Sequence, residues 1–227
     1  MAKLTWDNTS ERLYETGVKN GVLYVQAADG SYGNGVAWNG LTAVTESPSG
    51  AEANPLYADD IKYLELMSNE EFGGTIEAYT YPEEFAACDG SASLAKGVTI
   101  GQQARKAFGF SYITTVGNDT EGNDYGYKVH IVYGAKASPS EKAYATINDS
   151  PEAITFSWEF TTTPVAVTGH KPTAHVEIDS TKVGDDDKMA ALLALLHGGD
   201  EAEPKLPTVE EIVAIFEAAQ DPEQPAA

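Results

Sequence analysis

The stretch 33–41 reads Gly-Asn-Gly-Val-Ala-Trp-Asn-Gly-Leu, and residues 45–52 continue it as Thr-Glu-Ser-Pro-Ser-Gly-Ala-Glu. Glycines bound a short apolar run that carries one large indole, that of Trp38. Glycine in a strand pattern marks a bend, and Pro48 and Gly50 are typical turn residues. The stretch predicts a strand hinged by glycines at both ends, with Trp38 in the core, followed by a loop.

Apolar and polar residues alternate with a period of two in other segments. In the clearest one, Ile154, Phe156, Trp158 and Phe160 alternate with threonine, serine and glutamate. This period is typical of half-buried strands, so the fold class is mainly β, a sandwich or barrel. We expect strands at 22–28, 36–46, 61–67, 75–81, 108–116, 127–133, 154–160 and 174–178, with a hairpin turn at 117–124 and a long polar loop at 47–58.

Three segments carry helix signals. Residues 82–90 begin with proline and two glutamates and end with glycine, as a short helix does. A second helix is expected to start near Asp185, and a third follows the capping box of Thr208 and Glu211. Their apolar stripes are Met189, Leu192, Leu193 and Leu196, and Val209, Ile212, Val213 and Phe216.

The predicted helices suggest a domain boundary near Gly184. Residues 1–183 then form the β domain, and residues 184–227 form a helical extension. This extension docks either on the β domain or on a neighbouring subunit, and the sequence leaves both arrangements open. Its acidic end at 220–227 is expected to be disordered.

The chain is strongly acidic. Its 35 aspartates and glutamates outnumber its 14 lysines and arginines, which gives a net charge of −21 over 227 residues. Tight binding to nucleic-acid phosphates or anionic lipid needs basic side chains that neutralise negative charge. The composition therefore argues against both kinds of partner and favours solubility as the simplest role of the charge.

Cysteine content and the first residues bear on the compartment. Cys88 is the only cysteine, so an intrachain disulfide is impossible, which fits a reducing compartment. The first twenty residues lack the apolar core of a signal peptide, and no apolar run is long enough to span a bilayer. We expect the chain to fold in the cytoplasm.

Candidate catalytic and metal-binding residues are sparse. The four histidines, His130, His170, His175 and His197, lie in no HExxH or CxxC context, so the sequence gives no support for a zinc site. His197 is expected to complement a helix C-terminus, and Cys88 to be a buried apolar residue rather than a nucleophile. Residues 118–124 and 185–187 are better explained as a turn and as an acidic helix start than as cation sites. We expect no enzyme activity, no cofactor and no metal.

Four segments, taken in order, resemble the major tail protein family of long-tailed bacteriophages, of the siphophage type. The first is 33–52 as quoted above, and the second is Gly-Tyr-Lys-Val-His-Ile-Val-Tyr-Gly at 126–134. The others are Ser-Trp-Glu-Phe-Thr-Thr-Thr-Pro-Val at 157–165 and Ile-Asp-Ser-Thr-Lys at 178–182. The resemblance runs from about residue 21 to about residue 216. It implies a tail-tube-type β-sandwich or barrel with one short inserted helix and two short C-terminal helices.

The resemblance also implies a function. Proteins of this family are structural virion proteins, assembled in the host bacterial cytoplasm, whose hexameric rings stack into the tail tube that conducts viral DNA. The implied partners are further copies of the chain, a tape measure protein, and tail terminator and distal tail proteins, with transient passage of DNA and no membrane. The residues implied to contact the next ring are those of the polar loop, namely Ser47, Pro48, Ser49, Gly50, Glu52, Asn54 and Tyr57.

Three other interpretations stay open. A tube protein of a phage-like bacterial injection system has a closely similar fold. A surface β-sandwich binding module, such as an adhesin, is less compatible with the missing leader sequence. A β-sandwich carbohydrate-active enzyme would show activity on polysaccharides.

Overall fold

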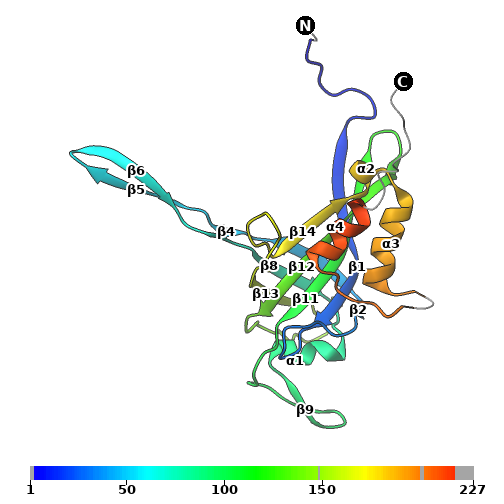
Figure 1. Ribbon diagram of the computed structural model, residues 1–227. Coiled ribbons are helices and arrows are strands. Elements are labelled where there is room, and N and C mark those ends of the chain that lie inside the picture. The colour runs from blue at the N-terminus through cyan, green and yellow to red at the C-terminus, as the bar shows by residue number, and fades with distance from the viewer. Residues whose placement is uncertain (1–2, 148, 200–201, 218–227) are drawn as a thin grey trace.

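The computed structural model describes residues 3–147, 149–199 and 202–217, and it is mainly β, with 46% strand and 15% helix. A large antiparallel sheet has the strand order β2-β1-β11-β12-β13-β8-β3, with β14 paired to β12 (Figure 1). The expected fold class of a mainly β chain with a few short helices is thereby confirmed. The strands are β1 (Leu13–Val25), β2 (Val36–Trp38), β3 (Leu41–Glu46), β8 (Gly73–Ala78), β11 (Phe108–Asn118), β12 (Gly122–Ala137), β13 (Phe156–Thr162) and β14 (His175–Asp179).

The sheet curls back on itself. Its two outermost strands, β2 and β3, are neighbours along the chain and are joined by Asn39 and Gly40 alone. Gly40 has a φ of +75°, a conformation that glycine adopts without strain. The single strand predicted at 36–46 is therefore wrong, because this turn divides it into two strands that lie at opposite ends of the sheet order.

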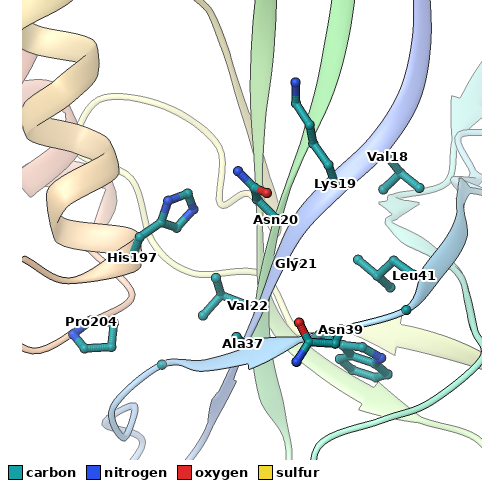
Figure 2. Close-up of a pocket in the computed structure, with 13 residues that line it drawn as sticks. Val18, Lys19, Asn20, Gly21, Val22, Ala37, Asn39, Leu41, His197 and Pro204 are labelled. Carbon is teal, nitrogen blue, oxygen red and sulfur yellow. The ribbon is translucent and has the colours of Figure 1, made fainter.

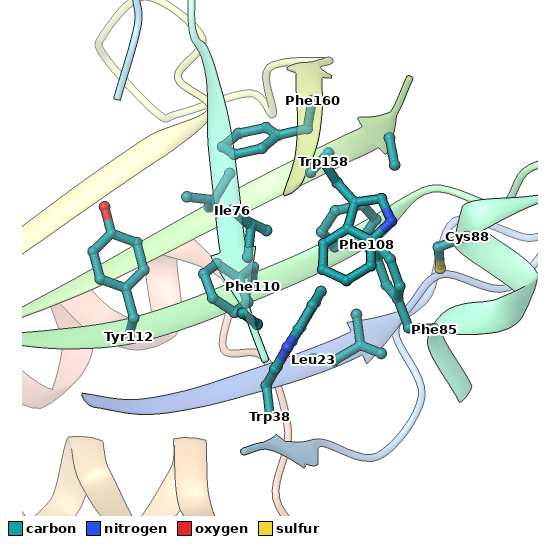
Figure 3. Close-up of a cluster of buried hydrophobic side chains, with 14 residues drawn as sticks. Leu23, Trp38, Ile76, Phe85, Cys88, Phe108, Phe110, Tyr112, Trp158 and Phe160 are labelled. Atoms are coloured by element: carbon teal, nitrogen blue, oxygen red, sulfur yellow. The ribbon is translucent and has the colours of Figure 1, made fainter. Parts of the chain in front are cut away.

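The curled sheet encloses an aromatic core, here called the inner cluster (Figure 3). Trp38 is 3% exposed and packs against Phe85 and Trp158, with ring centroids 4.6 and 5.6 Å away. Its Nε1 donates a hydrogen bond to the carbonyl oxygen of Thr80 at 3.0 Å. The prediction that Trp38 belongs to the core is confirmed. Large aromatic surfaces of this kind dominate the stability of a small β-core.

The outer face of the sheet is covered by helices α3 (Asp186–His197) and α4 (Val209–Glu217) (Figure 1). Met189, Leu192 and Leu196 of α3 are buried against this face. The hydroxyl of Tyr24 donates to the Leu196 carbonyl at 2.6 Å, and that of Tyr133 donates to the Pro207 carbonyl at 2.9 Å. Of the two arrangements left open, the structure shows the helices packed on the sheet of their own chain.

Capping hydrogen bonds confirm the predicted starts of α3 and α4. Asp185 caps α3 by accepting a hydrogen bond from the Lys188 amide at 3.1 Å, and Thr208 and Glu211 exchange the two hydrogen bonds of a capping box. The stripe predicted for α4 is wrong at Val213, which is 42% exposed. A helix α2 (Ser180–Val183) was not predicted. The predicted tail at 220–227 lies outside the described residues.

Other boundaries differ by a few residues from those predicted. The segment 82–90 forms a 3-10 turn (Glu83–Phe85) and helix α1 (Ala86–Asp89), which Gly90 ends with a φ of +77°. β1 begins nine residues before the predicted strand at 22–28. The expected hairpin turn at 117–124 is confined to the residues between β11 and β12, where the Asn118 side chain accepts a hydrogen bond from the Glu121 amide at 2.6 Å.

The predicted loop at 47–58 is wrong. The segment forms β4 (Ser49–Gly50) and β5 (Ala53–Ala58), the outgoing limb of a long hairpin. On the returning limb, β6 (Ile61–Met67) pairs with β5, and β7 (Glu70–Glu71) pairs with β4. This hairpin projects far from the sheet (Figure 1). Proline is tolerated in β5 because, among the described residues, β5 pairs with β6 alone, and a strand edge without a partner needs no amide donor. A second, shorter hairpin is formed by β9 (Ala92–Ala95) and β10 (Val98–Ile100).

Candidate functional site: a projecting arm and the polar cluster at its root

The hairpin from Ser47 to Glu71, here called the arm, stands free of the rest of the chain. Every residue from 45 to 71 is exposed. At its tip, Asp59 and Asp60 have φ values of +50° and +62°, as in the two-residue hairpin turns that favour aspartate, asparagine and glycine. A two-stranded hairpin is at best marginally stable in water. The arm is therefore suited to gaining its order by contact with another molecule.

Apolar side chains lie on both faces of the arm. Leu56 faces Leu64 across one face, and Leu66 lies on the same face two residues further along. Tyr57 and Met67 lie on the opposite face, because successive side chains of a strand alternate, whereas Ile61 pairs with Ala58 beyond a register shift that leaves Tyr63 unpaired in the β5–β6 register. Tyr57, Ile61, Tyr63 and Met67 are 63–70% exposed. A contiguous exposed apolar surface of this kind marks an interaction site.

The residues predicted to contact a neighbouring subunit all lie on the outgoing limb of the arm. They are exposed and belong to one projecting segment: Ser47, Pro48, Ser49, Gly50, Glu52, Asn54 and Tyr57. Sequence reasoning missed the returning limb, which supplies Ile61, Tyr63, Leu66 and Met67. One signal in the sequence could have revealed this limb. The predicted strand 61–67 is apolar on both faces, and the preceding segment 47–58 is long enough to pair with it as a hairpin.

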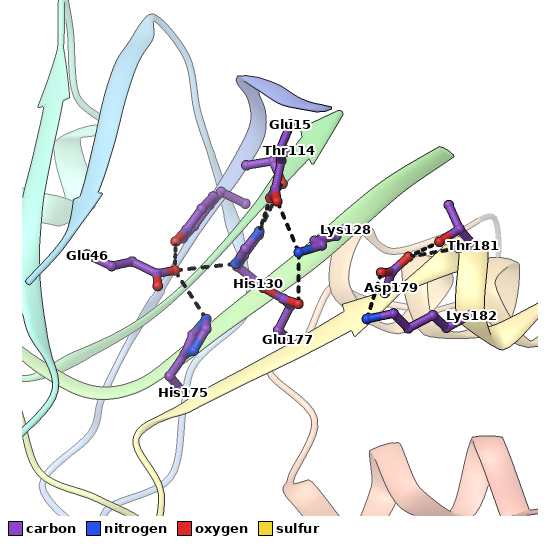
Figure 4. A network of polar contacts seen from close by, with 11 residues as sticks. Glu15, Glu46, Thr114, Lys128, His130, His175, Glu177, Asp179, Thr181 and Lys182 are labelled. Atoms are coloured by element: carbon purple, nitrogen blue, oxygen red, sulfur yellow. Dashed lines mark hydrogen bonds and ion pairs between the residues drawn. The ribbon is translucent and has the colours of Figure 1, made fainter. Parts of the chain in front are cut away.

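A polar cluster ties the root of the arm to the sheet (Figure 4). Oε1 of Glu46, the last residue of β3, lies 3.4 Å from Nδ1 of His130 on β12 and 3.3 Å from Nε2 of His175 on β14. The Tyr112 hydroxyl donates to the same Oε1 at 2.6 Å. His130 is buried and His175 is half-buried. The sequence did not predict this grouping of Glu46, His130 and His175.

Aromatic rings hold the two imidazoles in place. The ring of Tyr112 lies parallel to His130, with centroids 4.6 Å apart, and the ring of Phe72 lies parallel to His175, with centroids 4.7 Å apart. Tyr112 in turn stacks on Phe110 of the inner cluster. Phe72 directly follows β7, the last strand of the returning limb of the arm. A continuous series of ring contacts therefore leads from the core to the root of the arm.

A second polar chain extends from His130 along the sheet (Figure 4). Its Nε2 lies 3.0 Å from the Thr114 hydroxyl, which donates to Glu15 at 2.7 Å. Lys128 bridges Glu15 and Glu177, at 3.0 and 3.1 Å. Burial lowers the pKa of the Lys128 ammonium, but its two carboxylate partners raise the pKa by more, so that it lies above the usual value.

The environment fixes the charge states at the root of the arm. The adjacent His130 ring lowers the pKa of Glu46 to about 2 against the opposing effect of partial burial, and the Tyr112 hydroxyl adds to this lowering. Burial lowers the pKa of His175 below its usual value. Near neutral pH, Glu46 is therefore a carboxylate and His175 is a neutral imidazole. A carboxylate beside a neutral imidazole is a pairing that can bind a metal ion.

A hollow of about 390 Å³ lies beside β1 and the β2–β3 turn (Figure 2). The residues that line it include Lys19, Asn20, Trp38, His197 and Pro204. These lining residues contain no carboxylate, and their titratable side chains are those of Lys19 and His197.

The remaining candidate residues lie outside the polar cluster. Cys88 is fully buried, and burial raises the pKa of its thiol to about 12, which confirms the expected apolar role. His197 is the last residue of α3, where it was predicted. His170 is exposed in the connection between β13 and β14.

No family model matches this chain, and a search of curated proteins finds none that matches it. None of the helices in the described part of the chain is long and apolar enough to cross a membrane.

Proposed function

We propose that this protein is the major tail tube subunit of a long-tailed bacteriophage, a structural protein whose hexameric rings stack into a tube that conducts DNA. The observation that carries the proposal is the arm, a projecting hairpin that has apolar side chains on both faces and is exposed along its whole length. Such a segment is suited to lie on a subunit of the adjacent ring, where its exposed tyrosines and leucines would be buried.

The edges of the sheet support lateral association. Within the described residues, β14 pairs only with β12, and β3 pairs only with β8. An exposed strand edge offers unpaired amide and carbonyl groups to a neighbouring chain, and closure across subunits removes such edges. Rings of this chain would join neighbouring sheets into a continuous inner barrel, as the resemblance implies.

The charge supports a conduit rather than a DNA-binding protein. A net charge of −21 is spread along the sequence, and carboxylates at a lumen would repel phosphates over about 8 Å at physiological salt. The duplex would then pass without adhering. The tube would enclose a tape measure protein and meet terminator and distal tail proteins at its ends, in a virion assembled in the bacterial cytoplasm.

Electron microscopy and light scattering of the purified, concentrated protein test the proposal. We expect monomers or weak oligomers in dilute solution and hollow tubes of stacked rings on concentration. Compact dimers at every concentration would contradict it.

A further inference from the structure

We propose that Glu46, His130 and His175 bind a divalent transition-metal ion, zinc in the first place, which fastens the root of the arm to the sheet. This inference is independent of the tube proposal, because it rests only on the contacts within one chain. The three residues come from three different strands, β3, β12 and β14, and each offers a donor atom within 4.8 Å of the other two.

The distances between the donor atoms fit a metal ion. In a tetrahedral zinc site with metal–ligand distances of about 2.0–2.1 Å, neighbouring ligand atoms are about 3.3–3.4 Å apart. The Glu46 carboxylate oxygen lies 3.4 Å from Nδ1 of His130 and 3.3 Å from Nε2 of His175. The carboxylate and each imidazole thus already have the spacing of two ligands that share one ion.

Both ligand nitrogens are buried without a hydrogen-bond partner. These atoms are Nδ1 of His130 and Nε2 of His175. Buried polar atoms are nearly always bonded to protein or to ordered water, so two such atoms that face one carboxylate need an explanation. A cation bound between them satisfies both nitrogens and the carboxylate at once.

The hydrogen bonds around His130 select the tautomer that a metal requires. The Thr114 hydroxyl gives its single proton to Glu15, so its oxygen can only accept from Nε2–H of His130, 3.0 Å away. In the neutral ring that a metal binds, Nδ1, which lies 3.4 Å from Oε1 of Glu46, is then the nitrogen with the free lone pair. Orientation of a ligand imidazole through a hydrogen bond from its other nitrogen is a regular feature of metal sites.

The ligand set favours one class of ion. Two imidazoles and one carboxylate suit zinc and its first-row neighbours, whereas calcium and magnesium prefer sites made of oxygen atoms. Zinc imposes no electronic preference on geometry, and three protein ligands leave one position for water. Tyr112 and Phe72 already hold the planes of the two imidazoles, so metal binding would require little reordering.

Zinc titration of the tag-free full-length protein, after dialysis against a chelator, tests the inference near neutral pH. Calorimetry should show one zinc ion per chain, and Glu46→Gln and His175→Gln should each weaken binding by at least about tenfold. His170→Gln is the matched control, because it removes an exposed histidine outside the cluster and should leave affinity unchanged. Zinc should also raise the melting temperature of the parent and not that of Glu46→Gln.

A measurement on the parent protein guards against variants that fail to fold. X-ray absorption at the zinc edge should show two imidazole ligands with oxygen ligands and no sulfur. The inference is overturned if the parent binds no zinc at one equivalent, which would leave the cluster as a hydrogen-bonded group alone. It is equally overturned if zinc binds with the same affinity in Glu46→Gln and His175→Gln that retain the parent's circular dichroism.

Discussion

The ring of Phe72 lies flat against the imidazole of His175, with centroids 4.7 Å apart and parallel planes. Phe72 directly follows the returning limb of the arm, whereas Glu46, 3.3 Å from the same imidazole, ends the strand that leads into the outgoing limb. Both limbs are therefore held by one residue of the main sheet. Beyond this root every residue of the arm is exposed, so the structure combines a fixed base with an unsupported hairpin.

Replacement of Phe72 by leucine should lower the free energy of unfolding by about 1–3 kcal/mol, because it removes the stacking on His175 and part of the packing on Phe160. The loss should appear in urea denaturation, together with faster proteolysis at the root of the arm. Tyr79→Leu is the control, since Tyr79 is 55% exposed and should change stability by less than about 0.5 kcal/mol. Equal stabilities for the two variants would show that the stack does not anchor the arm.

Truncation of Trp38 to alanine should cost about 3–5 kcal/mol, because it opens a cavity among the aromatic rings of the inner cluster and removes the donor to Thr80. Trp6 provides a matched tryptophan, as it is 74% exposed. Its replacement by alanine should leave the denaturation midpoint nearly unchanged. If Trp38→Ala were as stable as Trp6→Ala, the assignment of Trp38 to the core would be wrong.

Exchange of Tyr57 and Tyr63 for serine should leave the subunit folded and slow its assembly, because both residues are about 70% exposed in the single chain and, on the proposed assembly, would be buried by a neighbouring subunit. Sedimentation of concentrated protein would measure the effect. Tyr144→Ser serves as control, since Tyr144 is 77% exposed outside the arm. Assembly that is reduced equally by both changes would mean that the arm has no special part in it.

Assembled tubes should not retain duplex DNA at physiological salt. Binding to DNA is driven by lysine and arginine side chains that neutralise phosphates and release their counterions, and a chain with a net charge of −21 has few such side chains. Co-sedimentation with labelled duplex would measure retention. Submicromolar binding that falls steeply with salt would indicate a basic DNA-binding surface and count against a repelling lumen.

Local patterns in the sequence were sufficient to predict most of the core and the helix ends. The alternation around Trp158 and the capping residues Asp185 and Thr208 act through near neighbours, so their positions follow from spacing alone. Pro55 and Gly50 were misleading. They are loop signals in most contexts, yet a hairpin with open edges accommodates a proline, and Gly50 with its φ of +82° lies where the arm leaves its root.

The polar cluster could not be predicted because it depends on strand register. His130 lies opposite Glu177 and Val132 opposite His175 in the pairing of β12 with β14, and a shift of one residue would move the histidines to opposite faces. Glu46 joins them only because the sheet curls at Asn39 and Gly40. None of these long-range relationships leaves a short motif in the chain.

The central claim is that the arm builds the tube, and electron microscopy of an arm-shortened variant tests it most directly. Replacement of residues 51–69 by Asn-Gly joins Gly50 to Glu70, which already pair across β4 and β7, and it leaves Glu46 and Phe72 in place. The variant should melt like the parent, since loop shortening changes closure entropy only modestly. The account predicts hollow tubes from the concentrated parent and none from the folded variant. Long tubes from the variant, or no tubes from the parent, would contradict it.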